Sequence, residues 1–430
     1  MKIVLKTILA ILARLTIWRF KPRIIGITGS VGKTSAREAV FAVLKSSYGI
    51  RQPEKNYNNE IGLPLTILGL PHRGNNFLAW GWGFIKSILR LFKFKNSYPE
   101  ILVLEYGVDR PGDMDYLLGI ARPNIAVVTA IGETPMHIEN FKEPEEIIFE
   151  KAKLVRSLPP DGCAILNHDD YAVYDLKDKT AAKTITYGFE EKAEVRAINY
   201  ELKTVWDEKL GEVPGGISFK IDHKKRVVPF KIYNAFGKPS VLAALAATAV
   251  GLCLDLNLIK IAEALIDWTP PAGRLRLLNG IKNSFVLDDT YNAGPESTRL
   301  ALDTLQNLPG KRKIAVLGDM LELGKYTEAA HRSIGDQAAK FLDMLITVGA
   351  RAKFVAEEAN LRGLDSSKIF RFDDADSIGD FLDHAIQEGD LILVKGSQGM
   401  RMEKIVEEIM NEPERAPELL VRQEKYWKNT

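Results

Sequence analysis

The chain alternates short, wholly apolar runs with longer segments whose apolar residues recur at helical spacing. The first run, "RIIGIT" at 23–28, leads through a glycine-rich turn into the helical pattern "SAREAVFAVLKSS". Similar apolar runs at 100–107 and 124–132 end in polar residues and glycine. Buried strands that alternate with amphipathic helices are typical of a mostly parallel sheet covered on both faces. The pattern therefore predicts an α/β fold that binds ligands beyond the carboxyl ends of its strands.

A second series of apolar runs begins after "PPAGR" at 270–274 and predicts a second α/β domain. Its strands are expected at 284–289, 312–320, 343–349 and 390–397. The proline pair Pro270 and Pro271 marks the expected hinge. The predicted organisation is a helix at 1–22, a phosphate-loop domain with a mostly parallel sheet at 23–272, a Rossmann-like C-terminal domain at 273–415, and a loosely docked tail at 416–430.

The N-terminal segment 1–22 combines an apolar sequence with a few basic residues. Its longest unbroken apolar run, at 8–13, is far shorter than the ~20 residues of a membrane-spanning helix. Lys2, Lys6 and Arg14 fall within about one third of a helical circumference, which is typical of an amphipathic helix on a membrane surface. A helix packed on the protein's own body explains the pattern about as well. A cleaved signal peptide is disfavoured because no small-residue cleavage site follows.

A second segment of this character, "FLAWGWGFIKSILRLFKFK", occupies residues 77–95. Lys86, Arg90 and Lys93 form a narrow basic stripe opposite aromatic residues, as in interfacial helices. A helical hairpin within its own domain and a dimer contact are the alternatives. A membrane surface is favoured because segment 1–22 has the same character.

Composition and charge narrow the class of protein only slightly. Hydrophobic residues make up 46% and charged residues 27% of the chain, as in ordinary globular proteins. The net charge of +2 gives no general field that would attract nucleic acid. Cys163 and Cys253 have no metal-ligand spacing and suggest no disulfide framework, which fits a reducing cytoplasm.

The stretch "GITGSVGKTS" at 26–35 is a variant of the phosphate-binding pattern G-x-x-x-x-G-K-[ST]. Ile27 stands where the first glycine is expected, but the stretch follows a strand and opens a helix. Its backbone N–H groups are therefore expected to cradle phosphates at a helix N-terminus. Lys33 would neutralise the terminal phosphates, and the Thr34 hydroxyl would bind Mg²⁺. The predicted ATP-binding residues here are Gly29, Ser30, Val31, Gly32, Lys33, Thr34 and Ser35.

Five further strings follow in order: "NYNNEIGLPLTIL", "LEYGVDRPGDM", "DDTYNAGPES", "VLGDMLELG" and "VKGSQGMRME". Together with the loop they resemble the Mur ligases from about residue 23 to about 410, and most closely the members that add D-Ala-D-Ala. The resemblance implies an enzyme that uses ATP to phosphorylate a carboxylate, which an amine then attacks to give an amide. It also implies Mg²⁺, a small-molecule peptidoglycan precursor and D-Ala-D-Ala as partners, and a cytoplasmic location.

The resemblance also assigns roles to residues of the first domain. Glu105 and His137 match metal ligands that would act with Thr34. Lys153 matches a lysine that is carbamylated in several members, and Lys151, two residues earlier, is the alternative. The predicted catalytic residues are Lys33, Lys153, His137 and Arg274.

In the second domain, Arg274 matches an arginine that reaches across the cleft to the nucleotide. The segment that would face the nucleotide contains Asp289, Tyr291 and Asn292. Lys395 is expected to contact the carboxylate of the incoming amino acid or peptide, and Asn59 is the second predicted substrate-binding residue. For Asp319 and Glu322 a structural role is the alternative to a role in the active site, and Asp319 would then cap a helix.

Three features depart from the family pattern. No domain corresponds to the one that usually holds the UDP end of the precursor, so either the nucleotide-sugar is held in another way or the acceptor differs. The two basic apolar segments lead to the hypothesis that the protein meets a lipid-linked precursor at the inner membrane face. The stretch G-x-H-N-x-x-N, which helps to hold adenine, reads "GKPSVLA" at 237–243, so base specificity is less secure than phosphate binding. Gly294 stands where the nearest members carry asparagine.

Two other functions stay open. One is a Mur-type ligase with another acceptor, as in the folylpolyglutamate synthetases, although "DDTYNAGP" and "GDMLELG" favour the peptidoglycan reaction. The other is an inactive relative that serves as a nucleotide-binding membrane scaffold. The altered adenine stretch favours the scaffold, whereas retention of the catalytic and metal-ligating residues favours activity.

Overall fold

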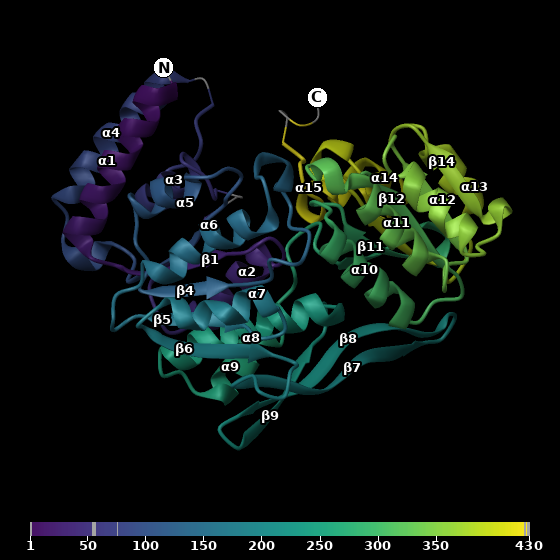
Figure 1. Ribbon diagram of the computed structural model, residues 1–430, viewed down its shortest axis with the longest axis horizontal. Helices are drawn as coiled ribbons and strands as arrows, with labels where there is room; N and C mark the ends of the chain where they lie inside the picture. The colour runs from purple at the N-terminus through teal and green to yellow at the C-terminus, as the bar shows by residue number, and fades with distance from the viewer. Residues whose placement is uncertain (1, 54–56, 75, 425–426, 428–430) are drawn as a thin grey trace.

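The computed structural model describes residues 2–53, 57–74, 76–424 and 427 of the chain. The described residues form a nine-stranded and a six-stranded sheet, each with its own helices, which lie beside each other in Figure 1. This arrangement confirms the predicted α/β class with two successive sheets.

The nine-stranded sheet has the order β2-β3-β1-β4-β5-β6-β7-β8-β9. Its strands are β1 (Arg23–Thr28), β2 (Ile50–Arg51), β3 (Ile101–Glu105), β4 (Ile125–Val128), β5 (Cys163–Asn167), β6 (Lys183–Gly188), β7 (Val195–Asp207), β8 (Gly211–His223) and β9 (Arg226–Ile232). Pairing is parallel from β2 to β7 and antiparallel between β7, β8 and β9. The carboxyl ends of β1, β3 and β4 therefore meet at one edge of the sheet.

Alternate residues of the central strands enter two different apolar clusters. On β1, Ile25 and Ile27 pack on the side of α2 (Lys33–Leu44), α8 (Gly237–Cys253) and α9 (Leu258–Leu265). Ile24 packs in the opposite cluster, which includes residues of α5 (Asp113–Leu118) and α6 (Pro144–Arg156). Burial on both faces explains why these strands read as continuous apolar runs.

The six-stranded sheet has the order β10-β11-β15-β12-β13-β14, and only β10 runs antiparallel to its neighbour. Its strands are β10 (Arg276–Asn279), β11 (Phe285–Asp289), β12 (Lys313–Gly318), β13 (Met344–Val348), β14 (Ile369–Phe372) and β15 (Leu391–Lys395). Its helices are α10 (Pro295–Asn307), α11 (Thr327–Ala338), α12 (Lys353–Leu361), α13 (Gly379–Ala385) and α14 (Glu403–Ile409). We call this part of the chain the C-terminal domain, and the part built on the nine-stranded sheet the central domain.

One apolar cluster runs from the central domain into the C-terminal domain. It contains Ile138 and Phe236 of the former together with Leu305 and Leu323 of the latter. Helices α8 and α10 are also in contact across this boundary. The two domains are therefore packed against each other, with apolar side chains on both sides of the junction.

The segment after α14 is packed more firmly than the sequence suggested. It forms the short helix α15 (Ala416–Leu419), after which Leu420 and Arg422 are buried against the C-terminal domain. The expected loose tail therefore does not describe residues 416–424, and residues 425–426 and 428–430 of that prediction lie outside the described residues.

Helices α1 (Lys2–Phe20) and α4 (Phe77–Leu91) lie side by side at the edge of the central domain (Figure 1). They pack on α3 (Gly62–Leu68) through an apolar cluster that includes Leu9, Leu12 and Trp80. Among the described residues, no helix is long and apolar enough to cross a membrane.

Three basic residues of this helix pair bond to the protein's own body, whereas Lys86 on α4 is exposed. Lys6 pairs with Glu60 at 2.5 Å, Arg14 donates to the Gly119 carbonyl at 2.7 Å, and Arg90 donates to the Leu68 carbonyl. The outward faces are apolar instead, and they include Trp18 and Trp82, which are 73% and 64% exposed. The amphipathic reading of segment 1–22 thus differs from the structure, because two of its three basic side chains hold the helix to its own domain.

Candidate active site

The phosphate loop lies between β1 and α2, at the sheet edge where β1, β3 and β4 end. Gly29 (φ +145°) and Gly32 (φ +87°) adopt backbone conformations that residues with a side chain rarely take. A Cβ on Gly29 would also lie 2.1 Å from the Thr129 hydroxyl, so glycine is required here by space as well as by backbone angle. The Ser30 and Val31 N–H groups donate to the Ala130 carbonyl at 2.7 and 3.0 Å. Because the Ser30 and Val31 N–H groups are already hydrogen-bonded, the N–H groups at the start of α2 are better placed than these two to bind phosphates.

Two lysines converge on the loop. Lys33 and Lys151 both donate to the Gly29 carbonyl, at 2.8 and 3.2 Å. Lys151 is 2% exposed, and burial, reinforced by the charge of Lys33, lowers its pKa to about 7. Burial also lowers the pKa of Lys33, which Glu105 opposes. The loop is therefore surrounded by cationic groups that have lost much of their hydration.

A buried carboxylate stands beside these cations. Glu105 ends β3 and is 2% exposed, with Oε2 3.5 Å from the Thr34 hydroxyl and 3.4 Å from Nη1 of Arg37. Arg37 was not predicted from the sequence, although its position three residues after Thr34 puts both on one face of α2. Two hard oxygen ligands thus lie together at the start of that helix, as Mg²⁺ requires.

The C-terminal domain contributes Arg274 to the same space. Its guanidinium lies 4.0 Å from the ring centre of Tyr291, and its charge contributes to the lowered pKa of Lys33. The Nε atom of Arg274 is buried without a hydrogen-bond partner among the described residues. A buried guanidinium nitrogen without a partner, on a cation close enough to act on Lys33, fits an anionic ligand between the two domains.

Two other predicted residues of this domain are tied to each other. Lys395 is 1% exposed and donates to Asp289 at 2.6 Å and to the Asn292 carbonyl at 3.0 Å. The Asn292 side chain accepts from the Gln398 N–H at 3.2 Å. Lys395 therefore holds the loop after β11 in place, and this geometry favours a structural role over the predicted contact with substrate.

Arg422, which follows α15, holds the loop after β11 in place. Arg422 donates to the carbonyls of Thr290 and Tyr291 and pairs with Glu403 at 2.7 Å. Arg422 thereby holds the backbone of Tyr291, whose ring contacts Arg274.

His137 lies where the two domains meet. Its Nδ1 is 2.7 Å from Oε2 of Glu322, and its Nε2 is 3.4 Å from Oδ1 of Asp109. Asp109 was not singled out in the sequence, although it follows Glu105 by four residues beyond the carboxyl end of β3. Its charge also raises the pKa values of Lys33 and Lys151, so Asp109 lies near both lysines as well as near the histidine.

Lys153 lies away from this group. It pairs with Asp115 and Glu150, each at 2.6 Å, and Glu150 in turn accepts from the Gly112 and Met114 N–H groups. Lys153 thus joins α6 to α5, whereas Lys151 on the same helix reaches the phosphate loop.

Two polar residues accept hydrogen bonds close to the start of a helix. Asn59 accepts from the Ile61 and Gly62 N–H groups at the start of α3. Asp319, which follows β12, accepts from the Arg351 and Ala352 N–H groups of the turn before α12, and α12 itself has no side-chain cap. The altered adenine stretch opens α8, where the Ser240 hydroxyl donates to the carbonyl of Phe236, the residue just before the helix.

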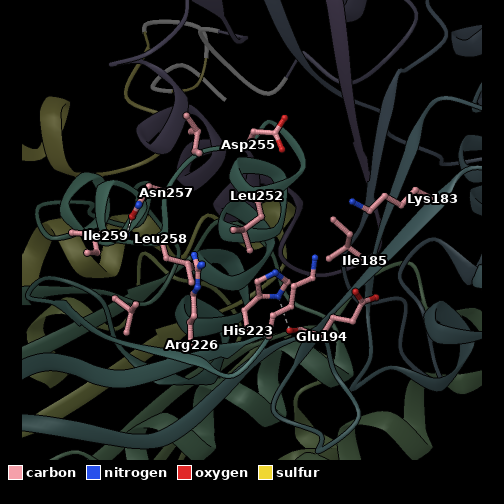
Figure 2. A pocket seen from close by; sticks show the side chains of 13 residues that line it. Lys183, Ile185, Glu194, His223, Arg226, Leu252, Asp255, Asn257, Leu258 and Ile259 are labelled. Carbon is pink, nitrogen blue, oxygen red and sulfur yellow. Dashed lines mark hydrogen bonds between the residues drawn. The ribbon is translucent and has the colours of Figure 1, made fainter.

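A separate hollow of about 510 Å³ lies between β8, β9 and the start of α9 (Figure 2). Its basic side chains include Lys183, His223 and Arg226, and Glu194 and Asp255 add opposite charge. None of the predicted site residues lines it. The candidate active site is therefore the region around the phosphate loop where the two domains meet, and not this hollow.

A phosphate loop, a buried carboxylate on the next strand and an arginine from a second domain define a two-domain nucleotide-binding enzyme. Residues 85–251 match the Mur ligase middle domain, and residues 273–398 match the Mur ligase, glutamate ligase domain. The chain belongs to the Mur ligase family.

Its relatives include UDP-N-acetylmuramoyl-tripeptide–D-alanyl-D-alanine ligase from Bacillus subtilis, which is 30% identical over 409 residues, or 95% of this chain and 80% of that protein. The ligase of the same name from Synechocystis is 31% identical over 396 residues, or 92% of this chain and 76% of that protein. Among solved structures, MurF ligase from Thermotoga maritima in complex with ADP matches with a TM-score of 0.76 and 26% identity, over 95% of this chain and 84% of that one.

Proposed function

We propose that the protein is an ATP-dependent amide ligase that joins D-Ala-D-Ala, or a similar amine, to the peptide carboxylate of a peptidoglycan precursor. In this reaction a carboxylate oxygen attacks the γ-phosphorus of ATP and ADP leaves. The amine then attacks the acyl phosphate and inorganic phosphate leaves. The observation that carries the proposal is that Lys33 and Lys151 both bond to the phosphate loop, while Arg274 of the C-terminal domain lies close enough for its charge to act on Lys33.

Each group has a task that its position supports. Lys33 offsets the charge of the terminal phosphates, and Arg274 stabilises the transferring phosphoryl group from the other side of the cleft. Thr34 and Glu105 are the proposed Mg²⁺ ligands, because their oxygens lie 3.5 Å apart beside the loop. Bound Mg²⁺ would supply charge neutralisation between two anionic substrates. The described residues contain no group of three ligating side chains, which fits an ion that keeps waters and phosphate oxygens.

We assign the carbamylated lysine to Lys151 in preference to Lys153. Only the neutral amine adds CO₂, and burial gives Lys151 a pKa of about 7. The Asp115 and Glu150 carboxylates instead raise the pKa of Lys153, which keeps that amine charged. A carbamate on Lys151 would add an anion close to Lys33 and the proposed metal ligands.

The test is phosphate release from ATP with Mg²⁺, UDP-MurNAc-tripeptide and D-Ala-D-Ala, with each acceptor omitted in turn. Release that needs both, together with the pentapeptide mass, is the expected result. Lys33→Ala should abolish turnover, and Lys45→Ala, exposed at the other end of α2, should leave it unchanged. Release without a pentapeptide product would refute the proposed acceptor, and full activity of Lys33→Ala would refute the phosphate-loop mechanism.

We also propose that the protein works in the cytoplasm and contacts an anionic membrane surface through helices α1 and α4, where a lipid-linked precursor could be met. More than half of the exposed large hydrophobic side chains among the described residues belong to this pair and the turn after it: Ile3, Val4, Ile11, Leu15, Trp18, Leu78, Trp82, Ile85, Ile88, Leu89, Phe92 and Phe94. Residues 1–37 and 61–99 contain no Asp or Glu, and Lys86, Lys93 and Lys95 are exposed. An apolar face edged by cations is what an interfacial helix pair presents to anionic lipid.

Co-sedimentation with vesicles of phosphatidylglycerol and of phosphatidylcholine tests this contact. The wild-type protein should bind the anionic vesicles more strongly, and the double variant Trp18→Ser, Trp82→Ser should bind them several-fold less. Trp206→Ser is the matched control, because Trp206 is equally exposed but lies on β7. Wild-type protein that fails to bind either vesicle would refute the membrane contact and leave the ligase proposal intact.

A further inference from the structure

His137 and Glu322 form a polar contact across the domain boundary. His137 belongs to the connection between β4 and α6, and Glu322 to the connection between β12 and α11. The 2.7 Å separation between Nδ1 and Oε2 is that of a strong, charge-assisted hydrogen bond. The two residues belong to different domains, so the contact exists only while these domains are packed together.

Both partners have unusual backbone conformations. His137 has φ +67° and Glu322 has φ +65°, in the left-handed region that residues other than glycine rarely adopt. Such conformations cost free energy and persist where the surrounding structure enforces them, often at active sites and switch regions. Two of them in one contact at a domain boundary indicate that the placement of these side chains matters more than local backbone stability.

The backbone around the pair is also joined across the boundary. The Glu139 N–H donates to the Glu322 carbonyl at 3.4 Å, and Glu139 also packs beside Gly324. The segment that carries His137 is therefore held by the same turn of the C-terminal domain that supplies the carboxylate.

Glu322 determines which ring nitrogen of His137 is free. When Nδ1–H donates to a carboxylate, Nε2 keeps its lone pair, which is the arrangement found at metal-ligating histidines. Nε2 then faces Oδ1 of Asp109 at 3.4 Å. In that tautomer a divalent cation between Nε2 and Oδ1 would be bound by both atoms.

We propose that Glu322 is a positioning residue that aims Nε2 of His137 toward the divalent cation when the C-terminal domain closes on the central domain. The inference rests on the proposed ligase function, in which His137 and the Thr34–Glu105 pair serve the metal. Closure then completes the environment of the cation as well as bringing Arg274 to the phosphate. A metal site that is complete only after closure would restrict phosphoryl transfer to the state in which the cleft is shielded from water.

The chain offers a control for general weakening of the domain contact. Lys325 pairs with Glu143 across the same boundary at 3.4 Å, and both side chains are about 60% exposed. An exposed pair of this kind contributes little to stability. Lys325→Ala therefore removes an interdomain ion pair three residues from Glu322 without touching His137.

The experiment measures Mn²⁺ binding to the whole protein in the presence of ADP, by the loss of the free-ion signal in electron paramagnetic resonance. Glu322→Ala should raise the Mn²⁺ dissociation constant by about 10-fold or more, which is the usual effect of removing such an orienting partner. Glu322→Gln, whose amide oxygen can still accept from Nδ1–H, should have a smaller effect, and Lys325→Ala should have none. His137→Ala should weaken binding, and adding Glu322→Ala to it should cause no further loss.

Wild-type affinity in Glu322→Ala, or a loss that is fully additive with that of His137→Ala, would overturn the inference. An equal loss in Lys325→Ala would also overturn it, since the effect would then come from the domain contact alone. Thermal unfolding of each variant shows that the binding measurements concern folded protein. The measurement needs no acceptor, so failure of the proposed ligase reaction would appear separately, as a wild-type protein that binds Mn²⁺ but forms no amide.

Discussion

Replacing Lys151 by methionine removes the buried amine that we assign as the carbamylation site beside the phosphate loop. The change keeps the length and apolar stem of the side chain, so the fold should be retained. We expect Lys151→Met to lose amide formation by at least 100-fold while still binding ATP through the loop. Lys153→Met, on the same helix, should stay within a few-fold of the wild type, because its amine pairs with Asp115 and Glu150 instead.

The magnitude follows from the lowered pKa of Lys151. At pH 7 an amine with a pKa of about 7 is roughly half neutral. A lysine with the ordinary pKa of 10.5 is only about 0.03% neutral, so burial increases the form that reacts with CO₂ by roughly a thousandfold. This difference favours carbamylation of Lys151 over that of a lysine with the ordinary pKa.

Two assays check this prediction. Carbon-13 NMR with labelled bicarbonate should show a carbamate signal in wild-type protein and Lys153→Met, and none in Lys151→Met. Acetate or formate added to Lys151→Met should restore part of the phosphate release by supplying the missing carboxylate. A carbamate signal that survives in Lys151→Met, or wild-type turnover of that variant, would refute the reasoning.

The same pKa predicts a pH dependence of stability. Because folding lowers the pKa of Lys151, the native state binds fewer protons than the unfolded state between about pH 7 and 10.5, and this contribution to stability rises with pH across that window. In CO₂-free buffer, Lys151→Met should therefore be more stable than the wild type at pH 6.5, by up to a few kcal/mol. The difference should shrink toward pH 10 in urea unfolding, and a difference independent of pH would contradict the assigned pKa.

Three further substitutions have defined outcomes. Lys395→Met should lower the free energy of unfolding by about 3–5 kcal/mol, because it leaves Asp289 buried without its partner, and adding Asp289→Asn should recover part of this loss in urea unfolding. Arg422→Ala should raise the KM for ATP several-fold in the coupled ADP assay, since it frees the loop after β11, and an unchanged KM would limit its role to stability. Gly29→Ala should abolish ATP binding in calorimetry, because its Cβ would lie 2.1 Å from a threonine hydroxyl, whereas Gly74→Ala, with no atom within 4 Å, should bind normally.

The parallel strands were predictable because they are buried on both faces and therefore read as unbroken apolar runs. The expected runs at 284–289 and 390–397 correspond to β11 and β15. The antiparallel strands β7 to β9 were missed, since much of β7 is exposed and its sequence mixes charged and aromatic residues. When charged and aromatic residues are mixed in this way, the alternation of apolar and polar residues that identifies a half-exposed strand is hard to recognise.

The site was predictable where its chemistry is local in sequence. Lys33, Thr34 and Glu105 stand at the junctions between strands and loops that parallel sheets use for ligands. Lys151 and Lys153 could not be separated, because two residues on a helix point in nearly opposite directions and the sequence does not give the rotation of the helix. Contacts such as that between His137 and Glu322 depend on how two domains pack, which no local pattern encodes.

The apolar cluster shared by the two domains determines what kind of barrier nucleotide exchange must cross. Ile138 and Phe236 would have to part from Leu305 and Leu323 before the cleft could open widely. Exposure of apolar surface carries a positive heat capacity, so the activation of ADP release should have one too. Its rate should then curve in an Eyring plot, unlike that of a hinge that opens only polar contacts. The rate of the catalytic cycle would then depend on the hydration of the apolar contact between the two domains, which is separate from the phosphate-binding groups.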